Sequence, residues 1–235
     1  MAAITPTSLE TVFAECRDMD GSLNERLATF AAAVRSQMPS FAAAVDRLVA
    51  RLRETGAGDA APKVGDVMPA FVLPDESNRL VGLQVLLQRG PVAVTFHRGH
   101  WCPYCRISIR ALAKTSAAMI AEGGQIVAVV PERQRYAAEL KADGDVPFPI
   151  LTDLDNGYAM SLNLAIWVGE EVKKVMRDQL DRDLATFQGN ESWMLPIPAT
   201  FVVGRDGKVK SRFVDPDYRK RMAVGELLAA LHRGI

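Results

Sequence analysis

The chain has few of the residues that bind metals or build disulfide frameworks: its 235 residues include three cysteines and three histidines. Basic and acidic residues both total 28, so the basic excess of a nucleic-acid or membrane-surface protein is missing. No apolar run approaches the roughly 18 residues of a membrane span. The opening MAAITPTSLE lacks the basic start and apolar segment of a secretory signal. These absences predict a cytoplasmic protein that binds neither nucleic acid nor membrane. In that reducing compartment, a cysteine pair is expected to be catalytic or metal-binding rather than structural.

The first part of the chain has a helical pattern. Thr7-Ser8-Leu9-Glu10 and Ser22-Leu23-Asn24-Glu25 fit the capping box, in which a hydroxyl accepts an N–H and a glutamate reaches back. Apolar residues then recur at helical spacing as far as Gly56, which predicts a stop, and the small, polar stretch 55–66 predicts a linker. We therefore predict a helical extension over residues 1–60. Its apolar stripe must pack on the main domain or on a second copy of the chain, so a homodimer is one of two expectations.

Residues 61–235 alternate between strand and helix patterns. Val92–Phe96 and Gln125–Val130 are short apolar strands with a helical pattern between them, which indicates a parallel βαβ unit. Ala199–Val203 and Val209–Val214 flank an Asp-Gly, the strongest short-range signal of a hairpin. The pattern predicts an α/β domain with a mixed central sheet flanked by helices on both faces.

The stretch HRGHWCPYC joins the first of these strands to the helix that follows. Pro103 suits the first position of a helix, because its missing N–H would have no partner there. Cys102 is then placed at the helix N-terminus, where unpaired N–H groups and the macrodipole stabilise a thiolate. Cys105 lies three residues on, so both sulfurs face the same side of the first turn and are able to form a disulfide.

Three interpretations of this stretch remain open. A tetrahedral zinc site has enough ligands, but they are consecutive rather than split into two pairs by a loop: His97, His100, Cys102 and Cys105. Two buried structural cysteines are the second interpretation. The third, favoured by a CxxC at a strand-to-helix junction, is a redox pair that needs no metal and no other cofactor. Arg98 and Arg106 add positive charge that favours a thiolate, and Trp101 offers an apolar face. Cys16, with no motif around it, is expected to be a packed apolar residue.

The chain resembles a known family in several segments besides the CxxC. KVGDVMPAFVLPDE, VTFHRGHWCPYC, FPILTD, PIPATFVVGRDGKV and FVDPDYRKR are similar to the peroxiredoxin-like branch of the alkyl hydroperoxide reductase and thiol-specific antioxidant family, in the thioredoxin superfamily. The resemblance runs from about residue 64 to the end. It implies a thioredoxin-like fold with the site at the start of the helix after VTFHRGHW.

The resemblance also assigns positions within the site. Aligned from Phe96, the position of the family's proline holds Arg98, that of its threonine holds Cys102, and that of the peroxidatic cysteine holds Cys105. The family's distant arginine falls on Pro198. The sequence therefore keeps the peroxidatic cysteine and departs from the family at its three helper positions.

A peroxidase mechanism follows most directly from this resemblance, which extends well beyond the CxxC. The Cys105 thiolate would attack the O–O bond of a hydroperoxide, and Cys102 would condense with the resulting sulfenic acid. A thiol reductant such as a thioredoxin or glutathione system would then reset the pair. Arg98 or Arg106 is expected to hold the peroxide in place of the missing family arginine.

Two further functions stay open. In disulfide exchange, as in thioredoxins and glutaredoxins, Cys102 would attack and Cys105 would resolve. Trp101, Ile197 and Pro198 would form the docking surface, with Pro198 matching the cis-proline of those proteins. The second of these functions is a redox sensor without enzymatic activity, in which the helical extension carries the signal to a partner. Residues 167–196 are expected to cover the site or to form a surface insertion, with a helix over Val172–Asp183 and Trp193 as a core or lid residue.

Overall fold

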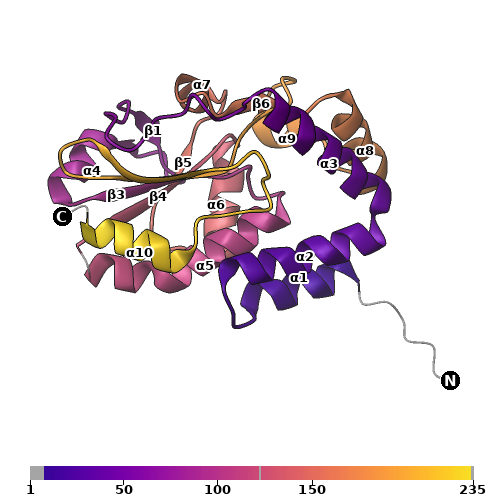
Figure 1. Ribbon diagram of the computed structural model, residues 1–235, viewed down its shortest axis with the longest axis horizontal. Helices are drawn as coiled ribbons and strands as arrows, with labels where there is room; N and C mark the ends of the chain where they lie inside the picture. Colours follow the sequence, from indigo (N-terminus) through magenta and orange to yellow (C-terminus); the bar gives the residue numbers. More distant parts are fainter. Residues whose placement is uncertain (1–7, 122, 234–235) are drawn as a thin grey trace.

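The computed structural model describes residues 8–121 and 123–233 (Figure 1). Its elements in chain order are α1 (Leu9–Asp18), α2 (Leu23–Gln37), α3 (Pro39–Glu54), β1 (Val72–Pro74), β2 (Leu80–Gly82), α4 (Leu83–Arg89), β3 (Val92–Phe96), α5 (Pro103–Ala121), β4 (Gln125–Val130), α6 (Gln134–Asp143), β5 (Ile150–Thr152), α7 (Gly157–Ser161), β6 (Ala165–Trp167), α8 (Glu170–Leu180), α9 (Leu184–Gln188), β7 (Met194–Pro196), β8 (Ala199–Val203), β9 (Val209–Val214) and α10 (Val224–Arg233). Within the described ranges, no helix is both long and apolar enough to cross a membrane.

The N-terminal helices begin where hydroxyl side chains cap them. The predicted capping box of α2 is confirmed: the Ser22 hydroxyl accepts the Glu25 N–H, and the Glu25 carboxylate accepts the Ser22 N–H at 2.9 Å. Helix α1 is capped by Ser8, whose hydroxyl accepts the Thr11 N–H at 3.2 Å. Thr7, the first residue of the other predicted box, lies outside the described residues.

The stretch predicted as a linker is a packed connection. Helix α3 ends at Glu54, and Gly56 follows in the left-handed region at φ +66°, which confirms the predicted stop. The turns after it lie against β9, because the Arg212 guanidinium donates hydrogen bonds to the carbonyls of Gly58 and Ala61. The end of the extension is therefore hydrogen-bonded to the domain. A domain boundary at residue 60 stays a prediction.

The central sheet has five strands in the order β5-β4-β3-β8-β9. Strands β3, β4 and β5 run parallel, and β8 is antiparallel to both β3 and β9. The predicted βαβ unit is thus β3-α5-β4, and the predicted hairpin is β8-β9. The turn of that hairpin contains Gly207 at φ +75°, a conformation that glycine adopts without steric cost. The mixed sheet flanked by helices is confirmed.

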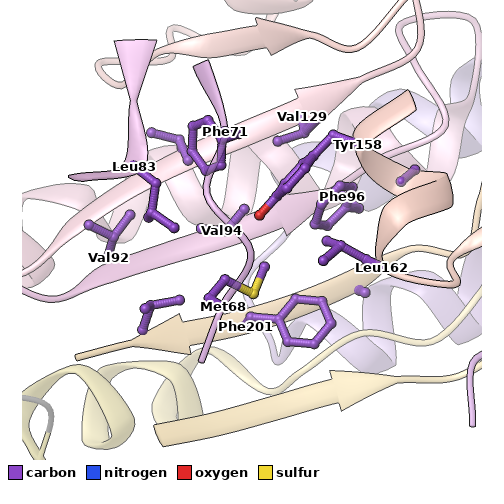
Figure 2. Close-up of a cluster of buried hydrophobic side chains, with 14 of the residues drawn as sticks. Met68, Phe71, Leu83, Val92, Val94, Phe96, Val129, Tyr158, Leu162 and Phe201 are labelled. Atoms are coloured by element: carbon purple, nitrogen blue, oxygen red, sulfur yellow. The ribbon is translucent and has the colours of Figure 1, made fainter. Parts of the chain in front are cut away.

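Alternation along β3 and β4 divides the core into two layers. Val92, Val94 and Phe96 face one side, where Figure 2 shows their side chains packed with residues of α4, α7 and the segment before β1. Ala93 and Ala128 face the other side, where α5, α6 and α10 cover the sheet. The end of β3 is buried from both sides, so the loop that follows it leaves the sheet from a fixed position.

The extension covers the end of the sheet that carries this loop. In Figure 1, α1 and α2 lie beside α5, and α3 lies beside α8. Phe30 of α2 packs edge-on against Tyr104, with ring centroids 5.1 Å apart. Trp193 is completely buried in the cluster between α3 and α8, so it is a core residue and not part of a lid. The predicted helix after Val172 is α8, which begins two residues earlier, at Glu170.

Candidate active site

Both cysteines of the CPYC turn lie where the sequence predicts them. Helix α5 begins at Pro103, and the Cys102 carbonyl accepts the first helical hydrogen bonds, from the N–H groups of Cys105 (3.0 Å) and Arg106 (3.1 Å). The two thiols are free and almost fully buried. A sulfur at each end of the first turn therefore enters the interior of the protein.

Polar donors surround the Cys105 sulfur. It accepts the Arg98 backbone N–H at 3.2 Å and the Arg221 guanidinium at 3.6 Å, and it hydrogen-bonds to the Cys102 thiol. Burial acts to raise the pKa of Cys105. The neighbouring Cys102 thiol and His97 ring, together with the charge of Arg221, outweigh it and hold the pKa well below its ordinary value. Cys105 is the thiol that this site ionises.

Cys102 has the opposite chemistry three residues away. Burial raises the pKa of its thiol well above the ordinary value, and the hydrogen bond to Cys105 and the charge on that sulfur raise it further. Arg98 opposes this shift without reversing it. These directions do not support the expected thiolate at Cys102: a buried dithiol carries one negative charge, and the groups around Cys105 favour that charge on Cys105.

His97 completes the polar side of the site. Its Nε2 lies 3.0 Å from the Thr95 hydroxyl, and its ring lies close enough to the Cys105 sulfur to favour the thiolate. The other ring nitrogen has no hydrogen bond of good geometry among the described residues. Burial lowers the pKa of His97, although the neighbouring Cys105 opposes the shift. A neutral imidazole beside a thiolate is the result.

Arg221 is the residue that the sequence did not reveal. It follows β9 in the segment FVDPDYRKR, far from the CPYC turn in the chain, and it is almost fully buried. Helix α2 holds its backbone from both sides: the Asn24 amide donates to the Arg221 carbonyl at 3.0 Å and accepts the Arg221 N–H at 3.2 Å. The extension thus holds the backbone of the residue whose guanidinium reaches Cys105.

The two arginines proposed as peroxide ligands are placed differently. The Arg106 guanidinium donates to Asp143 at 2.8 Å, and it shares this carboxylate with His100, whose Nε2 lies 2.6 Å from it. Arg98 contacts Cys105 through its backbone, while its guanidinium lies over the ring of Tyr218, 3.8 Å from the centroid. Of these three arginines, Arg221 supplies the guanidinium that hydrogen-bonds to the Cys105 sulfur.

The proposed zinc ligands do not come together. His100 pairs with Asp143 and Glu139, on the side of the loop away from the thiols. In the part of the chain that the structure describes, no three histidine, cysteine, aspartate or glutamate side chains converge on one ion position. The CPYC turn is therefore a dithiol site in its geometry.

Glu132, at the end of β4, holds the loop before Cys102. Its carboxylate accepts the His100 backbone N–H at 2.7 Å and lies against Gly99, where a Cβ would come within 2.3 Å of the Glu132 carboxyl carbon. Gly99 is therefore required both by this contact and by its φ of +126°. Burial raises the pKa of Glu132 to about 8, despite the hydrogen bond from His100.

The family is shown by the sequence itself. Residues 64–212, more than half of the chain, match the AhpC/TSA family. The chain belongs to the AhpC/TSA family. The match begins after α3, so the helices that hold Arg221 lie outside the matched residues. No curated protein matches the chain. The roles of Cys102 and Cys105 within this family member stay predictions.

Solved peroxiredoxin structures have the same fold as this AhpC/TSA protein. Peroxidoxin BcpB from Mycobacterium tuberculosis is 20% identical and has a TM-score of 0.57, covering 73% of this chain and 97% of its own. Reduced 2-Cys peroxiredoxin from Plasmodium vivax is 15% identical with a TM-score of 0.55, covering 72% and 94%. The yeast mitochondrial 1-Cys peroxiredoxin is 15% identical with a TM-score of 0.53, covering 71% and 73%. The predicted thioredoxin-like fold is confirmed.

The AhpC/TSA protein does not expose the predicted docking residues. Ile197 and Pro198 are both buried, Ile197 in the core beneath β8. All described peptide bonds are trans, including the bond before Pro198, so the match to the thioredoxin cis-proline is wrong. Trp101 alone of the three is partly exposed.

A cavity of about 410 Å³ separates the extension of the AhpC/TSA protein from the CPYC turn. Its wall is mostly apolar and aromatic, and it is formed by α1, α2, Met38 and Phe41 on one side and by the loop and first turn of α5 on the other. Cys102 is part of the wall, and Cys105 is not. A molecule in this cavity would lie against Cys102 and not against Cys105.

Proposed function

We propose that this AhpC/TSA family member is a thiol peroxidase that reduces hydroperoxides through the Cys102–Cys105 pair, with no metal or other cofactor. The observation that carries the proposal is the set of donors at the Cys105 sulfur: the Arg98 N–H, the Arg221 guanidinium and the Cys102 thiol. Donors that stabilise a thiolate also favour the negative charge that develops on a peroxide oxygen when the O–O bond breaks.

The reaction runs in two steps. The Cys105 thiolate attacks the outer oxygen of ROOH, the O–O bond breaks, and the alkoxide leaves as ROH after taking a proton; Cys105 becomes a sulfenic acid. The Cys102 sulfur then attacks the Cys105 sulfur, which releases water and forms the disulfide. The hydrogen bond between the two thiols supports this second step, because it keeps the resolving sulfur next to the oxidised one.

The peroxidase needs a thiol reductant to return the disulfide to the dithiol. The yeast mitochondrial 1-Cys peroxiredoxin is resolved through glutathione and thioredoxin systems, and we propose a reductant of this chemical kind here. A homodimer and a cytoplasmic location stay predictions from the sequence.

A single-turnover reaction tests the proposal. Fully reduced protein is mixed with hydrogen peroxide, oxidation is followed by tryptophan fluorescence, and the product is identified by intact mass. We expect oxidation far faster than that of free cysteine and a loss of two hydrogens per chain. Cys102→Ser should react as fast and gain one oxygen, whereas Cys105→Ser should lose the fast phase.

Cys16→Ala is the matched control, because Cys16 is buried in the same cluster as the pair but belongs to α1. Burial, with the neighbouring Glu15, raises the pKa of its thiol. The Cys16→Ala variant should leave both the peroxide step and the formation of the disulfide unchanged. Oxidation of the wild type at the rate of free cysteine would refute the peroxidase.

Disulfide exchange through Cys102 is the second candidate, because Cys102 lines the cavity and Cys105 does not. In that reaction Cys105→Ser should accumulate a mixed disulfide on Cys102 when it meets an oxidised substrate. The raised pKa of Cys102, caused first by burial, argues against it as the attacking sulfur. A Cys105→Ser protein that traps no partner would leave the peroxidase as the only enzymatic candidate.

A further inference from the structure

The cavity between the extension and the CPYC turn contains a buried cation with no carboxylate partner. The Arg98 guanidinium lies between the rings of Tyr218 and Trp101, 3.8 and 4.8 Å from their centroids, and Arg98 is 5% exposed. Across residues 8–121 and 123–233, no carboxylate lies within ion-pair distance of it. Arg98 nevertheless lines the cavity. A buried, permanently charged group of this kind favours an anionic ligand.

The other charged groups of the wall are paired with a carboxylate or lie in solvent. Arg106 pairs with Asp143 at 2.8 Å. Glu10 and Arg182 are exposed at the opposite side, on α1 and just after α8. The rest of the wall is apolar or aromatic, including Phe13, Phe30 and Phe41. The cavity therefore suits a molecule with an apolar body and one anionic group directed at Arg98.

The cavity is of small-molecule size and leads to one sulfur only. Its volume of about 410 Å³ lies in the range of small-ligand sites, roughly 300–1,000 Å³. Cys102 is in its wall, although only 1% of Cys102 is exposed. A small molecule that enters the cavity would lie against Cys102.

We propose that the cavity is the binding site of the reductant, a small organic thiol with an apolar body and a carboxylate, which pairs with Arg98 and attacks the Cys102 sulfur of the oxidised protein. This proposal rests on the proposed function for the origin of the disulfide. It names the chemistry of the reductant and the sulfur that it meets.

The exchange balances with two equivalents of thiol. The reductant thiolate attacks Cys102, the Cys102–Cys105 bond breaks, and the electron pair leaves on Cys105 as thiolate. A second thiolate then attacks the reductant sulfur of the mixed disulfide, which releases the reductant disulfide and the Cys102 thiolate, and Cys102 takes a proton. The donors around Cys105 favour this direction, because the sulfur with the lower pKa is the better leaving group.

The test uses protein oxidised by diamide, so that no peroxide step is involved. The probes are ω-mercaptooctanoate and ω-mercaptooctanol, which share the same thiol and alkyl chain and differ in the carboxylate. We expect the carboxylate to reduce the wild type faster by about ten-fold, the discrimination of roughly one charge-assisted pair. After rapid alkylation, peptide mapping should find the mixed disulfide on Cys102.

Variants distinguish the effect of Arg98 on the ratio of the two rates from that of positive charge elsewhere on the protein. Arg98→Met should bring the ratio of the two rates close to one, and Arg98→Lys should retain part of the preference. Arg35→Met is the control, because Arg35 is an exposed arginine of α2 outside the cavity and its removal should leave the ratio unchanged. If Arg98→Met does not fold, octanoate should inhibit the reduction of wild-type protein competitively, and octanol should do so less.

The outcomes are separable from those of the peroxidase test. Equal rates for the two thiols in the wild type, a mixed disulfide on Cys105, or a preference that survives Arg98→Met would each overturn the proposal. So would rapid reduction by a thioredoxin of a disulfide that both small thiols leave intact. Fast, selective thiol exchange in a protein that does not react with peroxide would instead overturn the proposed function.

Discussion

The two sides of the CPYC turn differ in what they offer a sulfur. The sheet side, formed by the loop after β3 and the segment after β9, offers donors and positive charge to Cys105. The extension side, formed by α1, α2 and α3, offers aromatic surface and a cavity to Cys102. One turn of helix therefore separates a stabilised thiolate from a neutral thiol. This difference is the basis on which we propose attack on a hydroperoxide by Cys105 and contact with a reductant at Cys102.

On the sheet side, the largest expected effect is the pH dependence of stability that Glu132 causes. Because its pKa is raised to about 8 from 4.5 by burial, its contribution to stability is complete below pH 4.5 and is lost as the pH rises towards 8. Glu132→Gln keeps an acceptor for the His100 N–H and removes the titration. Between pH 5 and 8 the wild type should lose on the order of 3 kcal/mol relative to this variant.

Urea unfolding at several pH values checks this expectation. Glu139→Gln is the control, because Glu139 is a more exposed carboxylate of α6 near the same loop. The control should follow the wild type. Parallel stability curves for wild type and Glu132→Gln would mean that Glu132 titrates normally in the folded protein.

Arg221→Met should reduce the difference in pKa between the two thiols, because it removes the guanidinium from Cys105. We expect the rate of reaction with hydrogen peroxide to fall on the order of 100-fold, the usual effect of losing one donor to a developing oxyanion. The pKa of Cys105 should rise, because the charge of Arg221 is one of the causes that lower it. Stopped-flow fluorescence at several pH values measures both effects.

The neighbouring Lys220→Met is the matched control, since Lys220 is exposed and has no contact with the pair. Arg221→Lys should recover part of the rate. If Arg221→Met reacts within two-fold of the wild type while remaining folded, Arg221 has no role at Cys105.

Asn24→Ala tests whether α2 of the extension positions Arg221 at Cys105, and its expected effect is smaller. The variant removes the two hydrogen bonds that hold the Arg221 backbone, at 3.0 and 3.2 Å, and leaves the guanidinium in place. We expect the peroxide rate to fall about five-fold, the equivalent of one ordinary hydrogen bond. Thr29→Ala, an exposed change on the same helix, should have no effect. Equal rates for the two variants would show that α2 does not position Arg221.

Local sequence signals predicted the parts of the fold that depend on nearby residues. Apolar runs of strand length gave β3 and β4, the Asp-Gly gave the β8-β9 hairpin, and Pro103 gave the start of α5. Ser22 and Glu25 gave the capped start of α2. Each of these signals acts within a few residues, so it survives in any tertiary context.

The parts that failed depend on distant contacts. Arg221 is 116 positions from Cys105, and only the folded chain shows that its guanidinium reaches the sulfur. The helix terminus predicted a thiolate at Cys102 and the family resemblance predicted one at Cys105, whereas the donors that favour Cys105 come from other segments of the chain. The sequence predicted that Arg106 holds the peroxide, but its guanidinium pairs with Asp143, which lies far from it in the chain.

The most direct test of the account is a pH titration of the two thiols in the reduced wild-type protein. Cysteine labelled with carbon-13 at Cβ reports each thiol by nuclear magnetic resonance, and Cys102→Ser and Cys105→Ser assign the signals. We expect Cys105 to ionise well below the ordinary range and Cys102 to stay protonated through neutral pH. A Cys102 signal that titrates first, with Cys105 still protonated, would contradict it and would move the attacking role to Cys102.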